Sequence, residues 1–263
     1  MNSVILSSTL HDPSFALKQT YKETVSSIKN FFKRSYICYT PTTSTEFVQA
    51  LVKEEFQVFS GVNLNHVDIY RRAIKASLDS VANKDARLFY IDFDRLLHWC
   101  KNFPTELSKI LCEINKMDFF ILGRTKRAFE THPSTQKETE IIVNELGSNV
   151  LGFSKTRDII SVCWGFTYEL GTKLLNVKNS TLTGFYGTWP LLLWKWASSK
   201  AYIEVEGLEW ETPDRYISDI KTVGYDRWLK NFENPNEWNK RVKILHDCLD
   251  ELLTIIQLKM ISF

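Results

Sequence analysis

The sequence predicts an α/β fold in which a mostly parallel central sheet is flanked by helices. Short apolar segments alternate with segments of helical periodicity through the first 125 residues, which is typical of βαβ units. The 263 residues suffice for one large domain, and 44% hydrophobic with 24% charged residues is ordinary for a globular protein. In such folds ligands bind beyond the carboxyl ends of the strands.

The first half shows the alternation most clearly. Strands are expected at 3–10, 35–39, 57–60, 87–94 and 118–123, with helices at 15–32, 45–53, 67–81 and 107–114. Pro13 stops the first strand because it lacks a backbone donor. Lys33 and Arg34 suit the negative end of the first helix, and Thr45 suits the start of the second.

The second half is less regular. Helices are expected at 137–151, 167–175 and 189–197, and strands at 159–164 and 201–205. The C-terminal segment carries an apolar stripe at alternating spacings of four and three residues, formed by Trp238, Val242, Leu245, Leu249, Leu252 and Ile256. We expect this helix to pack on the body, with a homodimer seam as the alternative.

Charge and cysteine usage exclude several classes of protein. Lys plus Arg number 33 against 31 Asp plus Glu, so no overall field attracts nucleic acid or an anionic membrane. The five cysteines form no C-x-x-C pair, which favours reduced thiols. Neither a signal peptide nor a transmembrane segment is evident, so a cytoplasmic location is expected.

Asp92 and Asp94 follow the most apolar predicted strand. Two carboxylates at alternate positions can approach one cation, and Mg²⁺ or Mn²⁺ is commonly bound by one or two carboxylates together with substrate phosphates. The pattern therefore indicates a metal and diphosphate site. In the alternative interpretation, one carboxylate caps the following helix and the other pairs with Arg95.

Longer strings around this pair resemble a known family. They are Tyr90-Ile-Asp-Phe-Asp-Arg-Leu-Leu-His-Trp99, Ile121-Leu-Gly-Arg-Thr-Lys-Arg-Ala-Phe-Glu-Thr-His-Pro133, Gln136-Lys-Glu-Thr-Glu140 and Glu206-Gly-Leu-Glu-Trp-Glu-Thr212. Together with the strand order they are similar to nucleotide-diphospho-sugar transferases of the GT-A fold, and more narrowly to a group of microbial glycosyltransferase-like proteins. The resemblance covers about residues 3 to 216.

The resemblance implies one GT-A-like domain over 1–263, with a nucleotide-sugar-binding half at 1–123, an acceptor-side half at 124–216 and a helical extension at 217–263. Its activity would be metal-dependent transfer of a sugar from a nucleoside diphosphate to an acceptor that the sequence does not identify. Asp94 would be the more direct metal ligand, and Asp92 would face the ribose or a metal-bound water. The donor nucleotide would contact Ser7, Ser8, Thr9 and either Arg71 or Arg72.

A second group of candidates follows the strand at 118–123. Arg124, Lys126 and Arg127 form a basic trio suited to phosphate, because Arg can bind it through two parallel hydrogen bonds. A solvated basic turn is the alternative. His132 is a candidate for contact with a phosphate or an acceptor hydroxyl, and a surface turn is again the alternative.

The catalytic base is the weakest part of the resemblance. The family carries an acid in a G-x-D-x-x-W-P segment, whereas Gly184-Phe-Tyr-Gly-Thr-Trp-Pro190 has Tyr186 there. A phenol is a poor base at neutral pH. Glu209, Glu211 and Asp214 are the substitutes. Two other functions stay open: a nucleotide- or glycan-binding homologue without turnover, and a sugar nucleotidyltransferase, although segment 7–13 lacks the glycines that such enzymes carry.

Overall fold

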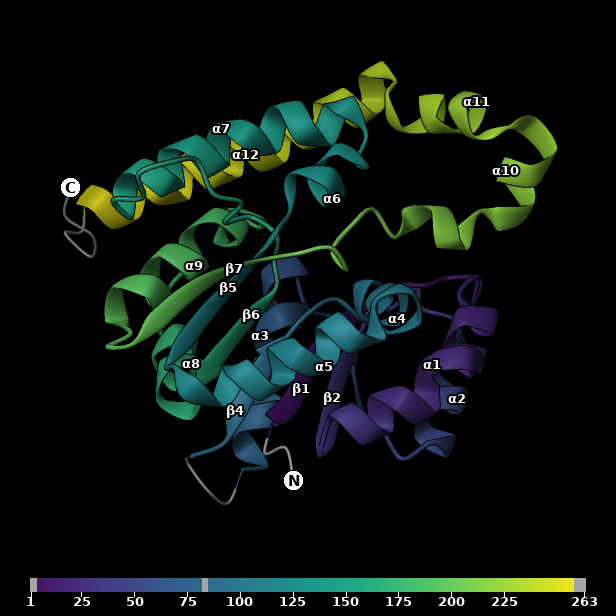
Figure 1. The fold of residues 1–263 in the computed structure, drawn as a ribbon, viewed down its shortest axis with the longest axis horizontal. Helices are drawn as coiled ribbons and strands as arrows, with labels where there is room; N and C mark the ends of the chain where they lie inside the picture. The colour runs from purple at the N-terminus through teal and green to yellow at the C-terminus, as the bar shows by residue number, and fades with distance from the viewer. Residues whose placement is uncertain (1–3, 82–84, 258–263) are drawn as a thin grey trace.

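The computed structural model describes residues 4–81 and 85–257 (Figure 1). Within them, a seven-stranded sheet has the order β3-β2-β1-β4-β6-β5-β7. Strand β6 is antiparallel to both of its neighbours, and the remaining pairs are parallel. The strands are β1 Val4–Leu10, β2 Arg34–Tyr39, β3 Gln57–Ser60, β4 Arg87–Tyr90, β5 Phe119–Arg124, β6 Trp164–Thr167 and β7 Lys200–Val205. The predicted mostly parallel α/β fold is confirmed.

Helices cover both faces of the sheet. One face carries α1 Lys18–Phe31, α4 Phe93–Asn102 and α5 Pro104–Glu113, with α2 Thr45–Lys53 beside β3. The other carries α3 His66–Asp79, α8 Tyr168–Leu175 and α9 Phe185–Trp196, and α7 Ser134–Val150 packs on α9 together with α12 Pro235–Gln257. The short elements are η1 Ile114–Lys116, α6 Lys126–Glu130, η2 Thr212–Arg215, α10 Ile217–Val223, α11 Tyr225–Leu229 and η3 Lys230–Phe232.

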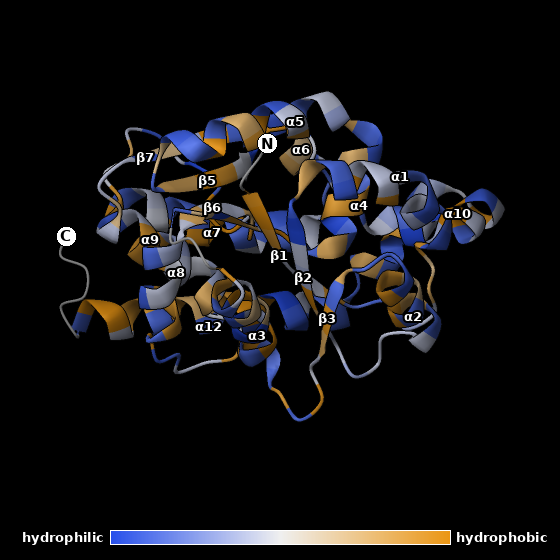
Figure 2. Ribbon diagram, turned by 90° about the horizontal axis from the view of Figure 1, so that it is seen from below, coloured by the Kyte–Doolittle hydropathy of each residue, from blue (hydrophilic) through white to orange (hydrophobic). Residues whose placement is uncertain are grey.

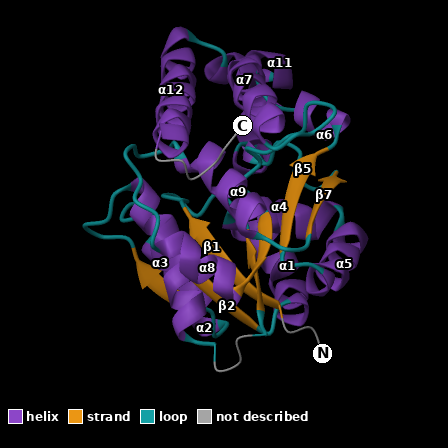
Figure 3. Cartoon of the chain, turned by 90° about the vertical axis from the view of Figure 1, so that its left-hand side faces the viewer, coloured by secondary structure: helices purple, strands orange, loops and turns teal. Residues whose placement is uncertain are grey.

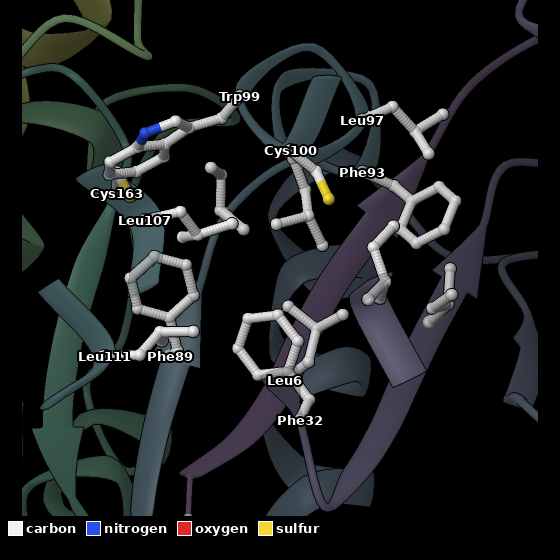
Figure 4. Packing of buried hydrophobic residues seen from close by; sticks show 14 of the residues in the cluster. Leu6, Phe32, Phe89, Phe93, Leu97, Trp99, Cys100, Leu107, Leu111 and Cys163 are labelled. Atoms are coloured by element: carbon white, nitrogen blue, oxygen red, sulfur yellow. The ribbon is translucent and has the colours of Figure 1, made fainter. Parts of the chain in front are cut away.

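Alternation along β4 divides the core into two layers. Leu88 and Tyr90 point to the side of α3, α8 and α9, while Phe89 joins the cluster under α1, α4 and α5. Figure 4 shows Phe89 in this second cluster between Phe32 and Trp99. Their ring centroids lie 5.8 and 6.3 Å from that of Phe89. Hydrophobic colour follows β1 and β5 in the interior in Figure 2.

The C-terminal helix α12 packs on the body, as the apolar stripe predicts (Figure 3). Its inward face contains Cys248, Glu251, Leu252 and Ile255. Val242, which the stripe assigns to the packed face, is instead 49% exposed. Between η2 and α12 the chain forms an arm, residues 216–232, that carries α10 and α11 out from the sheet (Figure 1).

Two predicted strands are wrong in their bounds. The strand expected at 87–94 ends at Tyr90, because α4 begins at Phe93. The strand expected at 159–164 forms only from Trp164. The amides of Ile159 and Ile160 donate to the Asn144 side chain instead of a neighbouring strand.

None of the helices in the described residues is long and apolar enough to cross a membrane. All five cysteines fall in the described residues and are free thiols, of which Cys112 is exposed.

Candidate functional site at the carboxyl ends of β1 and β4

The strand order places a topological switch point between β1 and β4. From β1 the sheet continues through β2 and β3 on one side and through β4 on the other. Chain connections therefore leave β1 and β4 in opposite directions, and such a crevice is where open α/β sheets bind ligands. Thr9 lies near the end of β1, and Asp92 lies two residues beyond the end of β4.

Asp92 occupies the N-cap position of α4, but its side chain forms no capping hydrogen bond. Instead Asp92 Oδ1 accepts hydrogen bonds from the hydroxyl of Thr9 at 2.7 Å and that of Tyr90 at 3.3 Å. The Ser8 hydroxyl donates to the carbonyl of Ile91 at 2.6 Å and holds the turn against β1. The capping alternative for Asp92 is therefore excluded, and its carboxylate is fixed at the switch point.

The charge on Asp92 is costly in this position. Burial raises the pKa of its carboxyl to about 6, the negative charge of Asp94 adds to the rise, and Arg95 opposes it. Asp92 Oδ2 has no hydrogen-bond partner among the described residues. A cation at this oxygen would relieve the unfavourable charge.

Asp94 lies in the first turn of α4, where the helix dipole favours negative charge. Its Oδ1 accepts from the amide of Arg95 at 2.9 Å, and its Oδ2 accepts from Arg215 Nη2 at 2.7 Å. The Arg215 guanidinium is 14% exposed and also lies 3.8 Å from Asp12 Oδ1. Asp12 in turn accepts from two amides of the loop before α1. Arg215 thus joins η2 to both the β1 loop and α4.

A cavity of about 120 Å³ opens beside these carboxylates. Its lining includes the carboxylates of Asp92 and Asp94 and the largely apolar side chains of Leu10, Ile69 and Tyr70. The polar side chains of His11, Thr40 and His66 also line the cavity. A larger cavity of about 660 Å³ lies at the opposite end of the strands. It is lined by residues that include Arg87 at the start of β4 and Asp118 before β5.

The structure brings the three predicted substitute bases near α4, and they differ in how far their oxygens are engaged. His98 on α4 lies between Asp214 at 2.8 Å and Glu209 at 3.1 Å, and Glu209 also pairs with Arg127. Glu211 is 9% exposed, and its Oε2 has no hydrogen-bond partner. The nearest cation to that oxygen is Arg95 Nε at 3.7 Å. Burial and the charge of Asp94 raise the pKa of Glu211.

Tyr186 contacts two of the residues that line the cavity, His66 and Tyr70. Its hydroxyl is 2.5 Å from His66 Nε2 and 3.1 Å from the hydroxyl of Tyr70. Burial and the charge of Asp92 raise the pKa of the Tyr186 phenol, and burial lowers the pKa of His66. The phenol is therefore less ionised at neutral pH than in water, and His66 is a neutral imidazole at pH 7.

The arginines of α3 do not face the carboxylates. Arg71 donates to the carbonyls of Leu175 and Val177 and to Asn179, after α8. Arg72 lies over the ring of Phe59, 5.3 Å from its centroid. Ser7 is buried, and its hydroxyl has no hydrogen-bond partner among the described residues. Of the residues expected to hold the nucleotide, only Thr9 and Asp92 meet at the cavity.

The candidates after β5 serve other contacts. Arg124 is 4% exposed and its guanidinium binds Asp158 and Glu140, so it is not free for a phosphate. Arg127 pairs with Glu206 and Glu209. His132 is 4% exposed beside the carbonyl of Ala128 rather than in a surface turn. Burial and two carboxylates engage Arg124 in this structure, and the phosphate role of the basic segment stays a prediction.

The residues present fit a divalent cation bound largely through a substrate. No group of three His, Cys, Asp or Glu side chains in the described residues forms a preformed metal cage. Mg²⁺ usually needs only one or two protein carboxylates when phosphates supply further oxygens. The unengaged Oδ2 of Asp92, together with the nearby carboxylate of Asp94, matches this chemistry.

No family model matches the chain, and no curated protein is similar to it in sequence. Among solved structures, it is similar to the crystal structure of glucosyl-3-phosphoglycerate synthase from M. tuberculosis, with a TM-score of 0.46 and 11% identity over 76% of this chain and 70% of that chain. The complex of that synthase with uridine diphosphate gives a TM-score of 0.44 and 12% identity over 76% and 68%. This likeness is too distant for transferring the role of any residue.

Proposed function

We propose that the chain is a glycosyltransferase that uses a nucleoside-diphosphate sugar donor and a divalent cation. The observation that carries the proposal is the placement of Asp92. Its carboxylate is fixed by Thr9 and Tyr90 at the switch point, with Asp94 beside it and a cavity alongside. This position suits a phosphate-bearing ligand in an open α/β sheet.

Each side of the cavity suits one part of such a donor. The apolar wall of Leu10, Ile69 and Tyr70 suits a nucleoside base, while Thr40 and His11 offer hydrogen bonds to it or to the ribose. Asp92 and Asp94 would hold Mg²⁺ or Mn²⁺ against the diphosphate. Such a cation, when bound, withdraws charge from the leaving diphosphate.

Glu211 is the residue we assign as the base for the acceptor hydroxyl. A general base needs an oxygen that is free to accept a proton, and Glu211 Oε2 has no hydrogen-bond partner. Glu209 is engaged through both oxygens by His98 and Arg127, and Asp214 is engaged through Oδ2 by His98. The raised pKa of Glu211 brings its basicity closer to neutral pH. Tyr186 is assigned no proton-transfer role, because its own pKa is raised further from neutrality.

A thermal-shift titration tests donor binding. UDP, GDP, ADP and CDP are each added with and without Mn²⁺, and at least one should stabilise the protein in a metal-dependent way. Asp94→Asn should abolish this response. Glu169→Gln, which changes an exposed carboxylate on α8 paired with Lys173, is the control and should respond like the wild type. Failure of every nucleotide to stabilise the protein with Mn²⁺ would contradict the proposal.

Turnover requires a separate measurement. Hydrolysis of the donor sugar in a long incubation, lost in Glu211→Gln while nucleotide binding persists, supports the transferase. Tight nucleotide binding without hydrolysis favours a homologue that binds nucleotide and has lost turnover. The hydrogen bonds of the Tyr186 hydroxyl to His66 and Tyr70 are consistent with this alternative. Release of pyrophosphate from a nucleoside triphosphate would instead indicate nucleotidyl transfer. The cytoplasmic location and the homodimer stay predictions.

A further inference from the structure

A third cavity, of about 390 Å³, lies within the arm of residues 216–232. The rings of Tyr216, Trp228 and Phe232 line it. Trp228 is 2% exposed, and its ring centroid lies 5.5 Å from that of Tyr216 and 4.9 Å from that of Phe232. Trp210 supports the same cluster from the body at 5.3 Å. The aromatic wall is thus held in place by its own packing.

The same cavity carries polar side chains that the fold does not use. Asp219, Thr222 and Asn231 line it, and the Thr222 hydroxyl donates to the carbonyl of Ser218. Within the described residues, neither the Asp219 carboxylate nor the Asn231 side-chain amide has a hydrogen-bond partner. Both groups are solvent-exposed and available to a ligand.

The arm connects directly to the candidate donor site. Tyr216 directly follows Arg215, and the Cα atoms of these two residues are therefore about 3.8 Å apart. The Arg215 guanidinium binds Asp94. Figure 1 shows the chain passing above α4 before it turns into α10. The arm that holds the cavity is therefore joined through one peptide bond to the residue that binds Asp94.

We propose that the arm cavity binds a saccharide and serves as the acceptor subsite. This inference rests on the proposed glycosyltransferase function. Aromatic rings stack against the apolar face of a sugar ring, and an unpaired carboxylate and amide can accept and donate hydrogen bonds to its hydroxyls. The volume lies in the range of small-molecule sites.

The test titrates the full-length protein with methyl glycosides of glucose, galactose, mannose and N-acetylglucosamine. Binding is followed by saturation-transfer NMR and by the fluorescence of tryptophan, since Trp228 lies in the cavity wall. We expect at least one glycoside to bind saturably in the millimolar range. The double variant Asp219→Asn, Asn231→Ala should weaken it at least about tenfold, because it removes hydrogen bonds to a charged and a polar group.

Matched controls separate this effect from damage to the arm. Asp226→Asn changes an exposed carboxylate in α11, and Asn239→Ala changes an exposed amide in α12, and neither residue lines the cavity. Both should bind the glycoside like the wild type. Absence of saturable binding by every glycoside, equal binding by the double variant, or preferential binding of n-octanol would each overturn the saccharide subsite.

Nucleoside diphosphate binding is measured on the same samples. Neither Asp219 nor Asn231 contacts Asp92 or Asp94, so the double variant should keep the nucleotide response. Normal nucleotide binding without glycoside binding overturns only the acceptor subsite. Absence of nucleotide binding by the wild type contradicts the proposed function itself. The two measurements thereby distinguish a failure of the acceptor subsite from a failure of the proposed function.

Discussion

Arg215 Nη2 donates a hydrogen bond to Asp94 Oδ2 at 2.7 Å, across 121 residues of sequence. The guanidinium holds a positive charge beside the carboxylate that we propose as a metal ligand. A bound divalent cation and Arg215 therefore compete for the same oxygen. The competition makes the arm segment sensitive to whether a cation is bound.

The variant Arg215→Gln should bind Mn²⁺ more tightly in the absence of nucleotide. Removing one positive charge near 4 Å changes the cation's energy by about 4 kcal/mol per unit charge at an effective dielectric of 20, before solvent screening reduces it. We expect the half-saturating Mn²⁺ concentration to fall by about tenfold. Electron paramagnetic resonance of free Mn²⁺ measures it. An unchanged or higher concentration would show that Arg215 does not compete.

Asp92→Asn should stabilise the protein without ligand at pH 8 and abolish the metal-dependent nucleotide response. In the folded state the pKa of Asp92 is raised to about 6. The protein therefore loses stability as pH rises from the unfolded-state pKa of this carboxyl to about 6, because the folded state must then hold an unfavourable charge. The amide oxygen can still accept from Thr9 and Tyr90. We expect a gain of about 1 to 3 kcal/mol at pH 8.

The pH dependence distinguishes this effect from general repacking. At pH 4 wild-type Asp92 is largely protonated, so the gain should shrink there. Urea unfolding of both proteins at pH 4 and pH 8 measures the difference. A gain that is equal at both values, or a loss at pH 8, would show that the Asp92 charge is not the cause.

The sequence predicts the sheet class and the Asp92 and Asp94 pair because both depend on local patterns. A continuous apolar run defines β4, and the two carboxylates follow shortly after it. The partner of Asp94 is not predictable in this way. Arg215 reaches it only after the chain has passed through β5, β6 and β7, and no spacing rule connects the two positions.

The contacts of the basic segment after β5 could not be predicted from its sequence either. Its sequence indicates a phosphate site, because three basic residues follow a strand end. The folded chain brings Asp158 and Glu140 to Arg124, and neither is adjacent to it in sequence. A short motif reports which charges are present, whereas their partners are set by tertiary contacts. The contacts of His66 and His98 are not predictable for the same reason. Their partners Tyr186, Glu209 and Asp214 lie more than 100 residues away in sequence.

Arg124→Leu should destabilise the protein without a specific effect on the ligand. The substitution leaves the buried carboxylate of Asp158 without its cation, while Glu140 keeps Arg241 at 3.9 Å. Breaking a buried pair in this way costs about 3 to 5 kcal/mol. Urea unfolding measures the loss. Nucleotide affinity of the folded fraction, measured at a temperature below its unfolding transition, should match that of the wild type. A selective loss of nucleotide affinity with unchanged stability would restore the phosphate role for Arg124.

His98 should make the attachment of segment 206–215 to α4 dependent on pH. Burial alone would lower the pKa of His98, but the hydrogen bond and charge of Asp214, followed by those of Glu209, outweigh it and raise the pKa. The imidazole also faces Asn102 on its own helix, and Glu209 is shared with Arg127. Because the folded pKa exceeds the unfolded one, this stabilisation is fully present below about pH 6.5 and is lost as pH rises through the folded value.

The comparison between the wild type and His98→Gln measures this contribution. Charged hydrogen bonds are lost in the variant, so it should be less stable by about 2 kcal/mol at pH 6. As pH rises through the folded pKa the wild-type imidazole loses its charge and the gap should narrow, since only ordinary hydrogen bonds then separate the two proteins. Limited proteolysis of segment 206–215 should follow the same trend. A gap that is constant from pH 6 to pH 9 would show that His98 joins α4 to this segment by packing rather than by its charge.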